Sequence, residues 1–387
     1  MGRGRIRRFA VGLVAAAVAT FGAAVVVAPA ASADGGMHTH ARHLYVATTG
    51  TDGPTCGRHE SPCRTIGAAV ANSTPGGEVS VARGTYTEMV TITIKLELEG
   101  HHATIDASNK NNGVDITGPG ASWSRVHGFT VMNAIGEGIL ASGVDHVTID
   151  HDVVDSNDRG SSGVPNFVPN SYMECQGQGN IPGDCGEGVH LQGTTNSRVD
   201  DTVITHNTGG ILVSDDFAPS HGNKITDNVS KDNLFDCGIT LPSHIPAGVF
   251  DNLVEDNVST GNGGAGVLIA AAGPGEQAYD NVVRDNRIWN NGEGGVQIHG
   301  HAPGQNLDGN QVVDNRIGTN NTMGDADSGD MQTTGIIVFS AVVPVNNMVI
   351  RDNDISNDHF GIWLSKNVAT QHVNDNDFHD VVVPTFQ

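Results

Sequence analysis

A 29-residue repeat limits what this chain can fold into more than any other feature of the sequence. Three similar segments, NLVEDN, NVVRDN and NQVVDN, begin at residues 252, 281 and 310. The related strings KITDN at 224–228 and VIRDN at 349–353 extend the series by one unit on each side. A period of this length is typical of solenoid proteins, in which each repeat packs only on its neighbours.

A second pattern, glycine followed by Ile or Val and then by an aliphatic residue two positions later, recurs within the same units. Its glycines are Gly188, Gly210, Gly238, Gly266, Gly295, Gly335 and Gly361. In the unit that begins at 281, apolar and polar residues alternate over 282–284, 287–289 and 295–298. Such alternation indicates half-buried strands. The repeat therefore predicts a coil of three short strands, stacked in register into parallel sheets.

Asparagine occupies the same turn in successive units, at Asn228, Asn257, Asn286 and Asn315. Asparagine tolerates the left-handed backbone region, and stacked asparagine amides can bond to each other. We interpret these four residues as a structural ladder and not as candidates for chemistry.

The start of the chain after residue 43 contains the strings LYVATTGTDG, CRTIGAAVA, GGEVSVARGTYTE and LELEGHHATIDA. These resemble the opening of secreted right-handed parallel β-helix repeat proteins, whose relatives include pectate lyases, alginate lyases and mannuronan epimerases. The resemblance implies an all-β, right-handed parallel β-helix with a short N-terminal cap over 34–78 and a cap helix near 66–72. It also implies a polysaccharide partner, although this fold carries many different reactions.

Residues 1–33 have the features of an export signal. Four arginines precede an apolar stretch over 9–27, and the small-residue site Ala31-Ser32-Ala33 follows. A membrane anchor is the alternative, but the A-x-A site and the short basic start favour cleavage after Ala33. We therefore expect a secreted protein with one domain over 34–387 and no later membrane span; the sequence gives no prediction of the oligomeric state.

The charge of the chain excludes one class of partner. Its formal net charge is −23 at pH 7, from 43 acidic and 20 basic residues. A strongly acidic protein is a poor ligand for nucleic acid. A polyanionic glycan would need a local basic patch or a bridging cation, so we consider calcium as the only possible cofactor.

The five cysteines of an exported chain predict two disulfides and one free thiol. We expect the short loops Cys56–Cys63 and Cys175–Cys185 to be closed and Cys237 to be free and buried. Cys237 is also an alternative partner for Cys185.

Candidate functional residues cluster around the glycine-anchored strands. The long non-repeating segment 158–186 is expected to be an inserted loop that leads into Glu187 and the first such strand. Because Val189 and Leu191 fit the inward positions of that strand, His190 should point outward. Other outward or loop residues of successive coils are Asp215, Asp216, His221, His244, Gln297, His299 and His301. We expect them to form an acidic, histidine-rich groove that binds substrate.

Three functions are compatible with this groove. In a lyase or C5-epimerase acting on a uronate-containing glycan, the first choice, His190 is the base, Glu187 orients it, and Asp215 or Asp216 binds a cation. In a glycoside hydrolase, Glu187 pairs with Asp215 or Asp216 as the two catalytic carboxylates. The third function is a non-catalytic glycan-binding or surface protein, in which these residues are turn caps.

One departure from the resembled family bears on the mechanism. Calcium-dependent pectate lyases use arginine or lysine as the base, and near the proposed groove the sequence offers only Arg159, Arg198 and Lys224. The small number of arginines and lysines near the groove favours histidine-based lyases and epimerases, or hydrolases.

Overall fold

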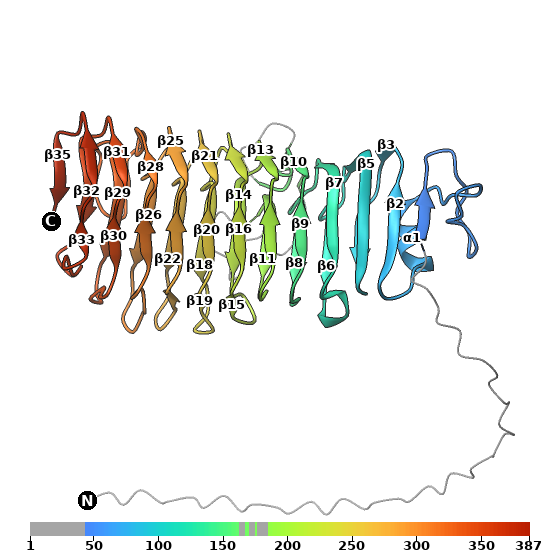
Figure 1. The fold of residues 1–387 in the computed structure, drawn as a ribbon, viewed down its shortest axis with the longest axis horizontal. Coiled ribbons are helices and arrows are strands. Elements are labelled where there is room, and N and C mark those ends of the chain that lie inside the picture. The colour runs from blue at the N-terminus through green and yellow to red at the C-terminus, as the bar shows by residue number, and fades with distance from the viewer. Residues whose placement is uncertain (1–42, 162–166, 170–174, 176–184) are drawn as a thin grey trace, which may run out of the picture. The chain divides into compact units, whose positions relative to one another are not determined.

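The computed structural model describes residues 43–161, 167–169, 175 and 185–387 (Figure 1). The predicted signal segment 1–33 and most of the predicted loop 158–186 lie outside the described residues. Residues 43–387 belong to one compact unit, and its strands pair in parallel throughout. The described chain is an all-β, right-handed parallel β-helix, as predicted.

The first coil is closed by a cap. Strand β1 (His43–Val46) pairs with β2 (Gly77–Val81), and helix α1 (Ile66–Asn72) lies between them in the sequence. The helix begins after Thr65, whose side chain accepts a hydrogen bond from the Ala68 backbone N–H, which is a common way to satisfy a helix start. The predicted cap helix is therefore found over the expected residues.

Two runs of strands form one sheet of 21 strands, because the long strands β5 (Leu96–Asp106) and β7 (Arg125–Met132) take part in both runs. The first run continues as β9 (Thr148–Asp150), β12 (Arg198–Asp200), β16 (Lys224–Thr226), β20 (Leu253–Glu255), β24 (Val282–Arg284), β27 (Gln311–Val313), β30 (Val349–Arg351) and β33 (Val373–Asn374). The second contains β3 (Gly84–Tyr86), β10 (Val153–Asp155), β13 (Val203–Thr205), β17 (Val229–Lys231), β21 (Val258–Thr260), β25 (Arg287–Trp289), β28 (Arg316–Ile317), β31 (Asp354–Ser356) and β34 (Asp377–His379).

The glycine-anchored strands belong to a separate sheet of 11 strands. They are β4 (Val90–Ile92), β6 (Val114–Thr117), β8 (Ile139–Ser142), β11 (Glu187–Gln192), β14 (Gly209–Ser214), β18 (Ile239–Ser243), β22 (Val267–Ala271), β26 (Val296–Gly300), β29 (Thr334–Ser340), β32 (Phe360–Leu364) and β35 (Val383–Phe386). Three coils add a short strand of a third sheet, namely β15 (Ser220–His221), β19 (Val249–Phe250) and β23 (Ala278–Tyr279). A 3-10 turn over Pro119–Ala121 follows β6.

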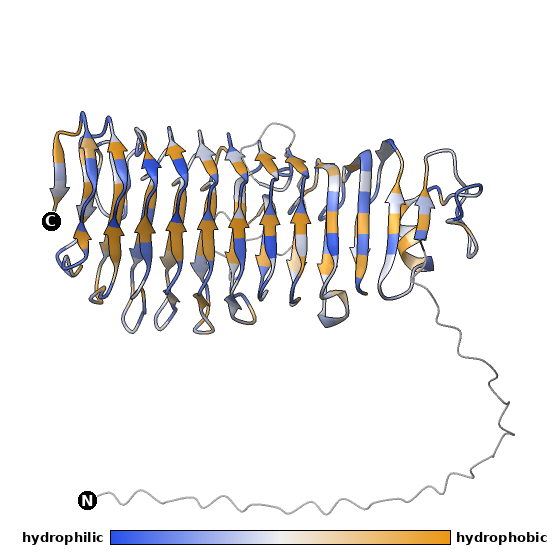
Figure 2. Ribbon diagram, viewed as in Figure 1, coloured by the Kyte–Doolittle hydropathy of each residue, from blue (hydrophilic) through white to orange (hydrophobic). Residues whose placement is uncertain are grey.

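The interior of the coils is filled by stacked aliphatic side chains. Ile239, Val267 and Val296 are paired across β18, β22 and β26, and each is fully buried. Figure 2 shows apolar residues recurring at similar heights in successive strands. Burying a side chain of this size stabilises a protein by about 1.5–3 kcal/mol, so the alternation seen in the sequence accounts for the core.

Asparagine ladders run along the turns, and the predicted ladder is confirmed. The side-chain amides of Asn228, Asn257 and Asn286 each donate to the side-chain oxygen of the asparagine in the next coil at 3.0 Å. The left-handed backbone, however, belongs to the preceding aspartates, such as Asp256 (φ 56°) and Asp285 (φ 58°), and not to the asparagines as the sequence suggested. The aspartate makes the turn, which leaves the asparagine side chain free to bond along the stack.

Two further ladders accompany the predicted one. The first joins Asn223, Asn252, Asn281 and Asn310. The second joins Asn157, Asn207, Asn233, Asn262, Asn291 and Asn320. Each asparagine also binds buried backbone groups, so the ladders satisfy polar atoms that the turns would otherwise leave without partners.

Candidate functional site

A cavity of about 300 Å³ lies on the outer face of the 11-stranded sheet. Its floor comes from the outward positions of β18, β22 and β26. Thr240, Leu268 and Gln297 are paired in one row, and Pro242, Ala270 and His299 in the next. The remaining lining residues lie in the turns before these strands (Phe235, Asp236, Cys237, Gly263, Gly264, Glu293), in the segments after them (His244, Ala272, His301) and in the connection between β28 and β29 (Asp327).

Two carboxyl groups stand in equivalent places on one side of this cavity. Asp236 is two residues before the anchor Gly238, and Glu293 is two residues before the anchor Gly295. The coil between them has Gly264 at this position, where a β-carbon would lie 2.8 Å from the Cys237 Sγ. A side chain is therefore excluded between the two carboxyl groups. Their backbone positions are two coils apart, or about 10 Å at the usual strand spacing.

Burial changes how these two groups hold a proton. Burial, together with the negative charge of Glu293, raises the pKa of Asp236 to about 6. Burial and the charges of Asp325 and Asp327 raise the pKa of Glu293. Since desolvation and like charges both disfavour a carboxylate, this part of the cavity can hold a carboxylic acid near neutral pH.

A second polar group at the cavity consists of His299, His301 and Asp327, with Asp325 next to His299. Nε2 of His299 lies 3.2 Å from Oδ2 of Asp325, and its Nδ1 lies 3.8 Å from Oδ2 of Asp327. Nε2 of His301 lies 3.6 Å from the same Asp327 oxygen. Although burial alone would lower it, hydrogen bonds to the two aspartates raise the pKa of His299 to about 9. Burial lowers the pKa of His301.

His244 connects the cavity to a buried polar chain. Its Nδ1 lies 2.5 Å from Oδ1 of Asp216, whose other oxygen accepts hydrogen bonds from Ser214 (2.5 Å) and Gln192 (3.0 Å). Although burial alone would raise it, the contacts with His244, His190 and Ser214 lower the pKa of Asp216. An aspartate in this position fixes the orientation of a histidine ring, as in acid–base catalysis.

His190 lies next to this chain, but it is not on an open surface as the sequence suggested. It is 1% exposed. Its Nε2 lies 2.8 Å from the Ser214 Oγ and 3.6 Å from Asp216, and its Nδ1 lies 3.8 Å from Glu137. The alternation that predicts an outward side chain is local, whereas its burial depends on groups from the neighbouring coils.

Asp215 was predicted as a catalytic or metal-binding group, and the structure places it in a hydrogen-bond network outside the cavity. It is fully buried. Its carboxylate accepts hydrogen bonds from the Ser243 hydroxyl and from the backbone N–H groups of His244, Ile245 and Gly248. The carboxylate therefore holds the loop after β18, and both of its oxygens accept hydrogen bonds from that loop or from Ser243.

Two other predicted residues lie outside the cavity. Glu187 is buried, and its carboxylate packs so closely on Gly209 that a β-carbon there would lie 2.0 Å from Oε2. His221 belongs to the small third sheet and stacks on Phe250, whose ring stacks on Tyr279, with 4.9 Å between centroids in each pair. The structure therefore does not place His221 with the candidate substrate-binding residues His244, Gln297, His299 and His301, which do line the cavity.

The cysteine predictions are confirmed. Cys56–Cys63 and Cys175–Cys185 are disulfides, and Cys237 is a free, buried thiol. Cys237 also lines the cavity, which the sequence did not indicate.

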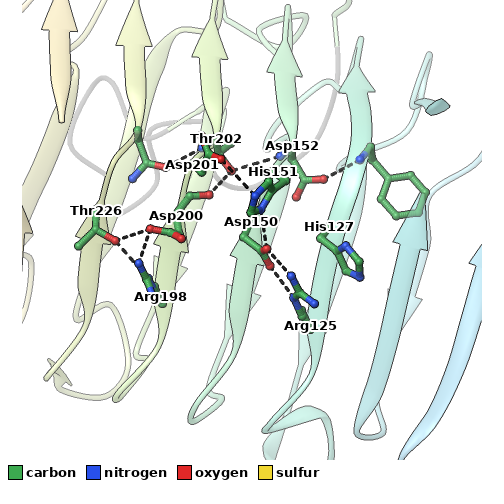
Figure 3. Close-up of polar contacts among 12 residues, drawn as sticks. Arg125, His127, Asp150, His151, Asp152, Arg198, Asp200, Asp201, Thr202 and Thr226 are labelled. Atoms are coloured by element: carbon green, nitrogen blue, oxygen red, sulfur yellow. Dashed lines mark hydrogen bonds and ion pairs between the residues drawn. The ribbon is translucent and has the colours of Figure 1, made fainter. Parts of the chain in front are cut away.

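The basic residues that the sequence placed near the groove lie elsewhere. Arg198 is on β12, in the 21-stranded sheet, where it bonds to Asp200 and Thr226 (Figure 3). Figure 3 also shows Arg125 of β7 bonded to Asp150 of β9, the strand that precedes β12 in the sheet. Lys224 pairs with Arg198 in that sheet, and Arg159 bonds to Asn133. None of the described residues that line the cavity is Lys or Arg.

The sequence analysis did not predict that Asp236, Glu293 and Asp327 line the cavity, or that Asp325 contacts His299. A signal for the first pair was present, because both stand two residues before an anchor glycine. No periodic signal marks Asp325 and Asp327, which lie in the long connection between β28 and β29.

Comparison with known proteins identifies a family and a fold. The family model described as "Periplasmic copper-binding protein (NosD)" matches residues 168–383. No curated protein matches the chain. A solved structure of GH136 lacto-N-biosidase from Eubacterium ramulus is 10% identical, with a TM-score of 0.55 over 88% of this chain and 68% of that one.

Lower-scoring similar structures include two lyases. Pectate lyase Pel9A is 14% identical, with a TM-score of 0.45 over 86% of this chain and 78% of that one. An alginate lyase from Paenibacillus sp. is 14% identical, with a TM-score of 0.44 over 82% and 95%. These similarities show the fold alone. Among the described residues, no helix has the length and apolar character needed to cross a membrane.

Proposed function

This chain belongs to the family described as periplasmic copper-binding protein (NosD), and we propose that it cleaves an uncharged polysaccharide in the cavity on its 11-stranded sheet. The matched region contains every residue that lines this cavity. The similar solved structures include polysaccharide lyases, epimerases and glycoside hydrolases.

One observation carries the proposal. Asp236 and Glu293 stand in the same register on one side of the cavity, with a glycine between them, and both have a raised pKa. A glycoside hydrolase needs one carboxylic acid to protonate the leaving oxygen and one carboxylate to activate water or attack the sugar. The negative charge of Glu293 contributes to the raised pKa of Asp236, so Asp236 can hold the proton while Glu293 is ionised.

The backbone spacing of Asp236 and Glu293 favours hydrolysis with inversion of configuration at the sugar carbon. Two coils separate the backbone positions by about 10 Å. Inverting enzymes hold their carboxyl groups roughly 6.5–9.5 Å apart to leave room for water, whereas retaining enzymes need about 5 Å. Because the backbone positions are two coils apart and not adjacent, we favour direct attack by a water molecule that the ionised carboxylate activates.

The lining of the cavity supports an uncharged substrate. Asp236, Glu293 and Asp327 face the cavity, no described lining residue is Lys or Arg, and His299, whose pKa is raised to about 9, supplies a positive charge. With three carboxyl groups beside that histidine, a uronate would meet more negative than positive charge, which opposes binding. For this reason we now prefer hydrolysis to the uronate lyase or epimerase activity that the sequence favoured.

A second candidate is elimination from a uronate, with His244 in place of His190 as the base. The 2.5 Å contact between His244 Nδ1 and Asp216 favours it, because an oriented histidine can abstract a proton. This reaction requires a positive charge to neutralise the uronate, and within the described part of the cavity that charge would have to come from a protonated histidine or a bound cation.

The cavity holds a set of residues that can bind the copper named in the family description. His299, His301 and Asp327 are brought together at one end of the cavity, and two imidazoles with a carboxylate suit Cu²⁺. When bound, copper would supply a positive charge at that end. We also propose that the chain works outside the cytoplasm, in line with its two disulfides and the family description.

The test is an activity screen of the purified protein on neutral oligosaccharides and polyuronates. We expect new reducing ends from a neutral glycan without the ultraviolet absorbance of an unsaturated product. Asp236→Asn and Glu293→Gln should each lower turnover by about 10²–10⁴-fold, with unchanged circular dichroism. Asp377→Asn on β34 is the matched control and should retain full activity. An ultraviolet-absorbing product from a polyuronate, or full activity in both variants, would contradict hydrolysis by this pair.

A further inference from the structure

His299, His301 and Asp327, which line the cavity, have the arrangement of a metal centre. One ligand atom from each of His299, His301 and Asp327 lies within 4.8 Å of the others, and no other described group of three or more His, Cys, Asp or Glu residues meets this condition. Ligands at about 2.0–2.2 Å from a transition-metal ion are roughly 3–3.5 Å apart. The distances of 3.6 and 3.8 Å from Asp327 to the two histidines are close to this range.

We propose that His299, His301 and Asp327 bind one divalent transition-metal ion, Cu²⁺ in preference to Zn²⁺, and that Asp325 positions His299 for this purpose. The family description names copper but assigns no residue. This inference does not depend on the proposed glycan cleavage.

Asp325 supplies the outer contact that such a site needs. It lies 3.2 Å from Nε2 of His299, on the opposite side of the ring from Nδ1, which faces Asp327. Metal-binding histidines usually give their second ring nitrogen to a carboxylate, which fixes the ring and strengthens the ligand. Asp325 is itself fixed, because its Oδ1 accepts a hydrogen bond from the Asp327 backbone N–H at 2.9 Å.

The histidines are also held in place by neighbouring coils. His299 lies next to the last residue of β26, and the backbone N–H of His301 donates a hydrogen bond to the Gln305 Oε1 at 2.7 Å. The Gln305 amide in turn donates to Ala271 and Gly273 of the previous coil. Phe339 of the next coil pairs with His299. Its ring centroid lies 5.8 Å from that of His299 and 5.7 Å from that of His301. These contacts hold the two histidines in place where they line the cavity.

The two imidazoles and one carboxylate of this site favour a transition-metal ion over calcium. Calcium prefers six to eight oxygen ligands, whereas this site offers two nitrogens and one carboxylate. For such nitrogen and oxygen ligands the divalent ions follow an order in which Cu²⁺ binds more tightly than Zn²⁺. Calcium, considered from the sequence at Asp215 and Asp216, is therefore replaced by a transition metal at a different place.

The experiment is a titration of the metal-free protein with CuSO₄ at neutral pH, followed by isothermal calorimetry and electron paramagnetic resonance. His38 and His40, which the sequence places near the N-terminus, are replaced by alanine in every protein compared, because histidines there would also take up copper. We expect one tight site per chain, a Cu²⁺ spectrum with nitrogen coupling, and a higher melting temperature with bound copper.

The variants assign the ligands. His301→Ala, which changes a partly exposed side chain, and Asp327→Asn should each abolish the tight site or weaken it at least 100-fold. Asp325→Asn should weaken it about 10–100-fold, as for other outer contacts. His221→Ala and His379→Ala are controls that should bind copper like the parent protein. ZnCl₂ should bind more weakly than CuSO₄, and CaCl₂ should not compete.

Three results would overturn the proposal: the absence of a tight copper site, a tight site unchanged in His301→Ala and Asp327→Asn, or equal loss in the two controls. Because copper binding is measured without substrate, failure of the glycan screen leaves this result interpretable, and the reverse also holds.

Discussion

Replacing Asp358 by asparagine is expected to stabilise the protein at neutral pH and to have little effect near pH 4. Asp358 is 2% exposed and ends the ladder that begins at Asn157. Its Oδ1 accepts a hydrogen bond from the backbone N–H of Asn320 at 3.1 Å, in the place that asparagine fills in earlier coils. Asn320 donates its own amide to the carbonyl of Gly318 at 2.8 Å. Asparagine at 358 could make the equivalent bond, whereas a carboxylate cannot.

The magnitude follows from the pKa of this group. Burial raises the pKa of Asp358 to about 8, whereas an unfolded aspartate has a pKa of about 3.9. The folded state therefore keeps a proton that the unfolded state releases, so stability is highest below about pH 4 and falls as the pH rises towards 8. At pH 7, about three pH units above the unfolded value, the loss has an upper limit of about 4 kcal/mol. We expect Asp358→Asn to recover about 1–3 kcal/mol of it, since the new amide must also bond well.

The assay is urea unfolding of the parent protein and Asp358→Asn at several values between pH 4 and pH 8, followed by circular dichroism. The gain in unfolding free energy should grow with pH and level off near pH 8. A gain that is the same at pH 4 and pH 7, or a less stable variant at neutral pH, would refute the reasoning that a buried, protonated carboxyl group ends the ladder.

The remaining predictions concern residues that the sequence singled out. Asn286→Ala should lower the unfolding free energy in urea by about 2–4 kcal/mol, because it leaves several buried backbone groups without partners, while glycan turnover per folded molecule stays near normal. His190→Ala should cost about 1–3 kcal/mol, as for a buried hydrogen-bonded side chain; a change below about 0.5 kcal/mol would indicate an exposed site. Asp215→Ala should lower the melting temperature, because the loop after β18 loses the carboxylate that holds it. Millimolar CaCl₂ should leave the melting temperature of the parent protein unchanged. A rise in that temperature with calcium would indicate that Asp215 is a metal ligand.

The sequence by itself determined the coil. Period-2 alternation and a 29-residue repeat are local properties, and a solenoid uses them directly because each coil repeats the register of the previous one. The strands 282–284 and 287–289 were therefore predicted at their observed bounds. The two short disulfide loops and the asparagine ladder follow from the same local rules, since their partners lie close in sequence or one repeat apart.

Only the tertiary structure decided which polar residues form a site. The alternation of apolar and polar residues correctly predicted that the His190 side chain points away from the core. Contacts with Glu137 and Asp216 of neighbouring coils nevertheless bury it. Asp215 and Asp216 are adjacent in sequence, yet one holds a loop and the other orients His244, because successive residues at a strand end face different surroundings. Asp325 reaches His299 from a long connection without periodicity. The path of such a connection depends on packing across coils, which no pattern within one repeat encodes.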